Sequence, residues 1–266
     1  MSLPSGSILS VSKVSGHSND ITVRRVREKV EAFYQQHIEI KESHGLKHVL
    51  AVVEHAQKAI HVHLPPLSFL DSRKVLVAAL LHDVDDDKYF PNNEYSENAR
   101  AIMTSVNLDE TMQSDVVELI SYVSCSKNKN HVPEIVVEDE SYWKLIPRWS
   151  DRLEAVGSVG VVRCYQYTCE NGALLSSIQS PRARTIKEVW EYASPERFEA
   201  YDGNSTDMIS HYYDKLLHIA RPPANIVRNS YLETAALESS RELMNICLQY
   251  GQTGVVDEEY IKSLSV

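Results

Sequence analysis

The sequence VLVAALLHDVDDDK, residues 75–88, indicates the fold class. It begins with an apolar run, Val75–Leu81, that is far shorter than the roughly 18–20 residues of a membrane span. A helix that is apolar on every side belongs at the centre of a domain. His82 and Asp83 end this run, and three more aspartates follow. A buried carboxylate is costly without a partner, and a helix C-terminus disfavours negative charge, so these groups together favour a bound cation. The alternative is a solvated acidic turn beside a core histidine.

Apolar residues recur at helical spacing along nearly the whole chain, and convincing strand alternation is absent. We therefore predict an all-α fold. The expected helices cover Asp20–Gln36, Leu46–Val62, Ser72–His82, Ser96–Val106, Glu110–Val123, Pro147–Tyr167, Ala183–Tyr192, Thr206–Ala220, Asn229–Tyr250 and Glu258–Ser263, with a polar loop over Ser124–Glu138. Residues 1–17 are expected to be a disordered leader. Residues 18–266 are expected to form one domain, in which 172–266 are a helical extension.

The charge balance and the cysteines exclude several classes of protein. The chain has 27 Lys+Arg and 37 Asp+Glu, a net charge of −10, which argues against a surface that grips a nucleic-acid duplex. Its cysteines show no C-x-x-C spacing, so neither a zinc ribbon nor a disulfide scaffold is indicated. We expect a cytoplasmic protein without a membrane partner. The pattern does not specify the oligomeric state.

Two other segments carry residue types that bind metals. His44 and His48 stand four residues apart at the start of an expected helix, where both can face one side. Asp151 lies near the expected start of the helix over Pro147–Tyr167. Its simpler interpretation is a stabilising negative charge at a helix N-terminus. Each segment alone is weak.

Together these segments form an ordered set: a His, then a His-Asp pair after an apolar helix, then a distant Asp-Arg-Leu-Glu-Ala. The set resembles the HD-domain superfamily of metal-dependent phosphohydrolases, an all-α helical bundle. The resemblance implies a metal site formed by His48, His82, Asp83 and Asp151. His48 matches better than His44 because His48-Val49-x-x-Val52 is similar to a family phrase. His44 is then expected at the rim of the site.

A finer resemblance is to the small HD nucleotide pyrophosphohydrolases. Three segments support it: residues 82–90, HDVDDDKYF; residues 124–127, SCSK; and residues 209–217, with HYYDKLL at their end. The chain departs from the usual Asp-Ala-Asp-Arg-Leu-Asp-Ala phrase at Trp149, Ser150 and Glu154. The resemblance implies hydrolysis of nucleoside or deoxynucleoside triphosphates to a monophosphate and pyrophosphate.

The residue chemistry is consistent with this reaction. Two imidazoles and two carboxylates suit a first-row divalent cation, with Mn²⁺ expected first and Mg²⁺, Co²⁺, Ni²⁺ or Fe²⁺ as alternatives. Asp86 is the candidate general base, and Lys88 is a candidate to neutralise phosphate charge. The candidate substrate contacts are His44, Lys127, Arg152, His211 and Lys215. A surface ion pair or a solvated face is the simpler interpretation for Asp86 and for each of the lysines.

Other functions remain open at this stage. Within the superfamily, the alternatives are a 5′-nucleotidase and a hydrolase of hyperphosphorylated guanosine nucleotides, because Asp86-Asp87 lies where the latter enzymes carry Glu-Asp. A different class is a non-catalytic, nucleotide-binding helical protein with a structural metal. The expected partner is in every case a small nucleotide.

Overall fold

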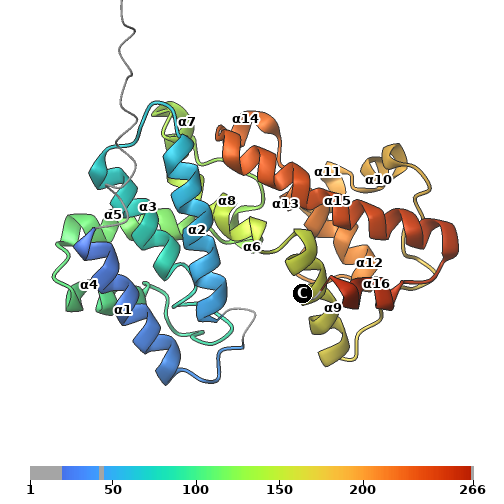
Figure 1. Cartoon of the computed structure of the whole chain (residues 1–266), viewed down its shortest axis with the longest axis horizontal. Helices are drawn as coiled ribbons and strands as arrows, with labels where there is room; N and C mark the ends of the chain where they lie inside the picture. Colours follow the sequence, from blue (N-terminus) through green and yellow to red (C-terminus); the bar gives the residue numbers. More distant parts are fainter. Residues whose placement is uncertain (1–19, 42–44, 265–266) are drawn as a thin grey trace, which may run out of the picture.

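The chain forms helices and no strand in the part that the computed structural model describes, residues 20–41 and 45–264 (Figure 1). The predicted all-α class is confirmed. The N-terminal part contains α1 (Ile21–Gln36), α2 (Leu46–Val62), α3 (Phe69–Leu81), α4 (Glu97–Ser105), α5 (Glu110–Ser121), α6 (Cys125–Asn128), α7 (Glu134–Glu138), the 3₁₀ turn η2 (Tyr142–Leu145) and α8 (Ile146–Leu153). The C-terminal part contains α9 (Gly157–Glu170), α10 (Ile186–Tyr192), α11 (Pro195–Ala200), α12 (Met208–His211), the π-helical turn η3 (Tyr212–Leu216), α13 (Leu217–Ala220), α14 (Ala224–Val227), α15 (Ser230–Thr253) and α16 (Glu258–Ser263). Among the described helices, none has both the length and the apolar composition of a membrane span.

Helix α3 is the centre of the first hydrophobic core, as its composition predicts. Its residues Val75–Leu81 are at most 1% exposed. It packs against α1, α2, α5 and α8, so that neighbours cover every side of it. Burying one Val or Leu side chain contributes about 1.5–3 kcal/mol. The end of α3, where His82 follows, is therefore held firmly inside the N-terminal part.

The buried hydrophobic side chains divide into two clusters, and α15 belongs to both. The first cluster runs from Val26 to Leu153 and includes Leu232 and Ala236 from the start of α15. The second begins at Val156 and includes the later residues of α15 together with residues of α9 to α13 and α16, whereas Val227 of α14 belongs to the first. Along the chain, the first change from one cluster to the other falls between Leu153 and Val156, and a helical extension over residues 172–266 stays a prediction.

The long helix expected over Pro147–Tyr167 is two helices. Helix α8 ends at Leu153 and α9 begins at Gly157, which has a positive φ of 67° that favours glycine. The glycine also allows close packing, because a Cβ atom there would lie 3.3 Å from Ser239 Oγ. The prediction that Asp151 opens a helix is therefore wrong: Asp151 lies in the last turn of α8.

Helix α4 begins where we expected, but Ser96 does not cap it with its side chain. Ser96 has a φ of 59° and makes no side-chain cap hydrogen bond. Asp85 does this instead: its carboxylate accepts hydrogen bonds from the backbone N–H groups of Asn98 and Ala99, both at 2.9 Å. A carboxylate at a helix N-terminus is also favoured by the helix dipole. One of the aspartates after α3 therefore has a structural role.

Candidate metal centre

The residues of the candidate site come from three helices that pack on one another. His48 lies in the first turn of α2, Asp151 lies in the last turn of α8, and His82 and Asp83 directly follow α3. Helices α2, α3 and α8 are in mutual contact. Their packing therefore brings together groups that are far apart in the sequence.

The side-chain donor atoms of these residues converge on one point. His48 Nε2 lies 3.2 Å from His82 Nε2, 3.2 Å from Asp151 Oδ1 and 3.5 Å from Asp83 Oδ2. His82 Nε2 lies 3.5 Å from Asp83 Oδ1 and 3.6 Å from Asp151 Oδ1. Donor atoms of His48, His82 and Asp83 all lie within 4.8 Å of one another. Metal ligands bonded at roughly 2.0–2.6 Å have separations of this order.

This donor set fits a divalent cation. The Nδ1 atom of His82 lies 2.9 Å from the carbonyl oxygen of Ala79, which can only accept a hydrogen bond. When His82 is neutral, its proton therefore belongs on Nδ1, and the lone pair of Nε2 is directed to the cluster. The His48 and His82 side chains are only 6% and 1% exposed. Two imidazole nitrogens with two carboxylates suit a first-row divalent metal.

The electrostatics of the cluster show that its carboxylates need positive charge. Burial lowers the pKa of the His82 imidazole, but the charges and hydrogen bond of Asp83 and Asp151 outweigh this and raise the pKa to about 9. Burial raises the pKa of Asp151, but hydrogen bonds to His48 and His82 hold it well below its usual range. Without a cation, the cluster therefore keeps a proton between imidazole and carboxylate. A metal ion would replace that proton.

The aspartates in the turn after α3 have different environments. The helix ends before it reaches Asp86, but the Asp86 N–H donates to the Asp83 carbonyl at 3.2 Å, so Asp86 still lies one turn beyond the candidate ligand. Its Oδ1 accepts the N–H of Lys88 at 2.8 Å. Asp87 is exposed and pairs with Lys127 at 3.0 Å. The surface ion pair that we considered for this turn thus involves Lys127, and the Lys88 side chain is exposed.

Of the remaining candidate contacts, His44 lies outside the described residues. Arg152 is 2% exposed, and its Nη1 donates to Asn130 Oδ1 at 2.5 Å while its Nη2 donates to the Lys129 carbonyl oxygen. Both terminal nitrogens therefore hold the loop at 124–131. This geometry gives no support to Arg152 as a phosphate contact.

His211 and Lys215 lie where α12 continues into the π-helical turn η3, two elements that contribute residues to the second hydrophobic cluster. Burial and the nearby Lys215 charge lower the pKa of His211 to about 4. The Lys215 ammonium lies 5.9 Å from the centre of the Tyr201 ring. Neither residue forms a hydrogen bond or ion pair with the four candidate ligands within the described ranges. The structure therefore places them on another set of helices.

Sequence reasoning missed two groups beside the cluster. The hydroxyl of Tyr34, on α1, is buried, and burial together with the negative charges of Asp83 and Asp86 raises its pKa. His55, on α2, contacts Glu154 and Tyr231 at 3.0 and 2.6 Å. No local motif marks these residues. The position of His55 seven residues after His48, which puts both on one helix face, is the only available signal.

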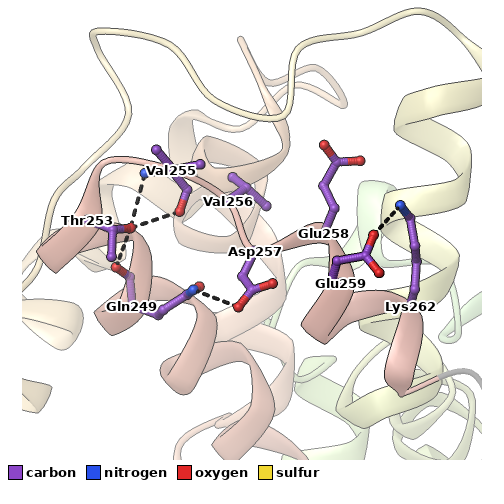
Figure 2. A pocket seen from close by; sticks show the side chains of 8 residues that line it. All are labelled: Gln249, Thr253, Val255, Val256, Asp257, Glu258, Glu259 and Lys262. Atoms are coloured by element: carbon purple, nitrogen blue, oxygen red, sulfur yellow. Dashed lines mark hydrogen bonds and ion pairs between the residues drawn. The ribbon is translucent and has the colours of Figure 1, made fainter.

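Two surface hollows lie on other elements. One, of about 400 Å³, lies at the turn between α15 and α16 and is rich in carboxylates (Figure 2). These carboxylates are engaged: Asp257 accepts from Gln249 at 3.1 Å, Glu259 pairs with Lys262 at 3.0 Å, and Glu258 accepts from Tyr165 at 2.5 Å. The other, of about 410 Å³, includes the ion pair of Arg197 and Asp214. Neither contains a residue of the candidate metal centre.

Comparison with solved structures defines the fold. An HD-superfamily hydrolase of Bacillus thuringiensis is 19% identical with a TM-score of 0.54, covering 85% of this chain and 96% of that one. A Lactobacillus plantarum protein is 17% identical with a TM-score of 0.61, covering 88% and 97%. A Listeria innocua protein is 15% identical with a TM-score of 0.55, covering 88% and 99%. The chain has the fold of an HD-superfamily hydrolase.

Comparison at the level of sequence relates the chain to a viral protein. No protein-family model matches the chain. A protein of Acanthamoeba polyphaga mimivirus, described as uncharacterized protein L803, is 36% identical over 223 residues, which cover 78% of this chain and 88% of the viral protein. The chain belongs to the same family as this mimivirus protein.

Proposed function

We propose that the chain is a metal-dependent phosphohydrolase that converts nucleoside and deoxynucleoside triphosphates to monophosphates and pyrophosphate. The observation that carries the proposal is the convergence of His48, His82 and Asp83 on one point, with Asp151 Oδ1 3.2 and 3.6 Å from the two histidines. The fold of an HD-superfamily hydrolase supports the same conclusion. A purely structural role would not explain why carboxylates gather around two buried histidines.

The four converging side chains would hold the cation. When bound there, a divalent ion such as Mn²⁺ supplies Lewis acidity toward water and phosphate oxygen. Asp86, whose N–H bonds to the Asp83 carbonyl one turn earlier, would accept the proton of the attacking water. Its Oδ1 also accepts the N–H of Lys88, which fixes the carboxylate relative to the turn.

The choice of a triphosphate rests on the resemblance of residues 82–90 and 209–217 to the pyrophosphohydrolases. A departing pyrophosphate gains negative charge, and cationic side chains stabilise it. Lys88, Lys127 and Lys215 are the candidates for this role, with His211 as a neutral hydrogen-bonding group because of its low pKa of about 4. In this proposal the substrate binds between α3 and the second hydrophobic cluster, where it contacts both the metal centre and Lys215.

The test is product identification across a nucleotide panel. The full chain is incubated with Mn²⁺ and each nucleoside or deoxynucleoside triphosphate, and the products are separated by ion-exchange chromatography. We expect a monophosphate and pyrophosphate, with no turnover after chelation. Orthophosphate from monophosphates would identify a 5′-nucleotidase, and pyrophosphate from guanosine tetraphosphate would identify a hydrolase of that nucleotide.

A matched pair of variants provides the control. Asp151→Asn removes one charge from the cluster, whereas Asp139→Asn removes one charge from the exposed end of α7. We expect the first to abolish turnover and the second to leave it unchanged. Tight metal binding without turnover of any phosphate ester or anhydride would contradict the enzymatic proposal and favour a nucleotide-binding protein.

A further inference from the structure

The hydroxyl of Tyr34 is buried without a hydrogen-bond partner in the described structure. Tyr34 lies in α1, which packs on α3, and the residue as a whole is 9% exposed. A buried hydroxyl without a partner costs about 1–3 kcal/mol. Phenylalanine would fill the same space without this penalty, so the fold alone does not explain why a tyrosine stands here.

The surroundings of this hydroxyl point to the candidate metal centre. Burial raises the pKa of Tyr34 well above its usual range, and the negative charges of Asp83 and Asp86 raise it further. The phenol therefore stays protonated, which makes it a hydrogen-bond donor and excludes a phenolate nucleophile. Asp83 is a candidate ligand and Asp86 the candidate base, so the two carboxylates whose charges act on this hydroxyl both belong to the candidate site, and α1 packs on the helix that precedes them.

Two other buried tyrosine hydroxyls also lack partners, but their environments differ. Tyr212 and Tyr213 lie in the second hydrophobic cluster. Burial is the main cause that raises their pKa values, and the other side chains that contribute, Cys164, Cys247 and Tyr192, include no carboxylate. Of the three, only Tyr34 combines a buried, unpartnered donor with carboxylates of the candidate site.

We propose that the Tyr34 hydroxyl donates a hydrogen bond to a reactant oxygen beside Asp83 and Asp86, and that Tyr34 is a catalytic residue. The inference rests on the proposed phosphohydrolase function. The accepting oxygen belongs to the attacking water or to a phosphoryl group, since both present a lone pair to the same donor. In either case the hydrogen bond forms only when the reactants are bound.

The decisive variant is Tyr34→Phe in the full chain. We expect its melting temperature without metal to equal or exceed that of the wild type, because the substitution removes an unsatisfied polar group. Mn²⁺ stoichiometry should not change. Turnover should fall about 10- to 10³-fold, the range for loss of one donor at a reacting group.

Binding of inorganic phosphate to the Mn²⁺-loaded protein separates the two oxygen sources. Weaker phosphate binding by Tyr34→Phe identifies a phosphoryl oxygen as the acceptor. Unchanged phosphate binding with a lower kcat identifies the water. Tyr250→Phe is the control for a structural hydroxyl, since Tyr250 is 3% exposed and donates to the Ser177 carbonyl at 3.2 Å. We expect it to lower the melting temperature and leave turnover unchanged.

Two results would overturn the inference. One is a Tyr34→Phe variant with unchanged kcat and KM, and the other is a variant that loses stability and metal together, as a structural hydroxyl would require. If the wild type hydrolyses no phosphate compound, the proposed function fails by itself. A protein without hydrolytic activity has no attacking water, so only a phosphoryl oxygen remains as the acceptor. Weaker phosphate binding by the variant then supports the Tyr34 contact, and equal binding refutes it.

Discussion

The Nε2 atom of His55 lies 3.0 Å from the Oε1 atom of Glu154. The other ring nitrogen of His55 lies 2.6 Å from the hydroxyl of Tyr231. With Glu154 ionised, Nε2 donates to the carboxylate and Nδ1 accepts from Tyr231, which satisfies all three groups. His55 follows His48 by about two helical turns, and Glu154 follows Asp151 by about one. The network thus joins the two helices that carry candidate ligands, α2 and α8, to α15.

We expect this network to stabilise the fold measurably. Glu154→Ala and His55→Ala should each lower the free energy of unfolding by about 1–3 kcal/mol, since a charge-assisted and partly buried hydrogen bond is lost. The double variant should lose less than the sum. Lys187→Ala, which removes an exposed ion pair with Glu191 within α10, should cost at most about 0.5 kcal/mol. Urea unfolding measures all four proteins, and additive losses would contradict a direct coupling.

Substitution of Asp151 and substitution of Asp86 should have different effects on metal binding and on turnover. Asp151→Ala should abolish both metal binding and turnover, because its Oδ1 lies within 3.6 Å of both candidate histidine ligands. Asp86→Ala should keep the metal and lower kcat about 10²- to 10⁴-fold, as expected for a general base. Elemental analysis gives the metal content, and steady-state kinetics gives kcat. A fully active Asp86→Ala would show that Asp86 only shapes the turn.

Metal binding should release a proton. In the metal-free protein the pKa of His82 is raised to about 9, so the imidazole is protonated at neutral pH. A cation must displace this proton, and its apparent affinity should therefore rise by about tenfold per pH unit until the pH exceeds the pKa. Calorimetric titration with Mn²⁺ in two buffers of different ionisation enthalpy counts the protons. Release of none would show that His82 is already neutral. His131→Ala, at an exposed histidine, should leave the count unchanged.

Two neighbouring lysines should differ in their effect on stability. Lys129 Nζ lies 2.6, 3.0 and 2.5 Å from the carbonyl oxygens of Phe198, Glu199 and Tyr201 at the end of α11. Lys129→Ala should lower the free energy of unfolding by about 1–3 kcal/mol. Lys127→Ala breaks only an ion pair in which both side chains are about two-thirds exposed, so its effect should be within about 0.5 kcal/mol. Equal losses for both would contradict this assignment.

The central helix was predictable because it depends on residues close together in the sequence. Val75–Leu81 is apolar on all sides, and only a buried helix tolerates that pattern. His82 and Asp83 follow it directly. Their convergence with His48 and Asp151 required the resemblance to a known arrangement, since no local pattern shows that α2 and α8 pack on α3.

The unpredicted features depend on tertiary packing. Helical periodicity continues across residues 154–156, so nothing in the apolar pattern marked the break before Gly157. Serine is a preferred N-cap residue, but at α4 the carboxylate of Asp85, from the preceding turn, accepts the backbone N–H groups of Asn98 and Ala99 in place of the Ser96 side chain. Lys127 and Lys129 are both lysines of one polar segment, and only the position of α11 shows that Lys129 is the one with a structural role. The role that we propose for Tyr34 depends on the packing of α1 against α3, which lies in another part of the chain.

Helix α15 contributes residues to both hydrophobic clusters, so we expect the two clusters to unfold as one cooperative unit. Leu232 and Ala236 complete the first cluster, while Leu243 and Ile246 belong to the second. Melting the second cluster alone would uncover part of the first, so neither half has an independent folding transition. Amide hydrogens in the middle of α15 should accordingly exchange only through global opening, with the same free energy as unfolding of the whole chain. A fragment that ends at Leu153 would lack part of its own core, and catalytic geometry on α2, α3 and α8 would depend on residues far downstream.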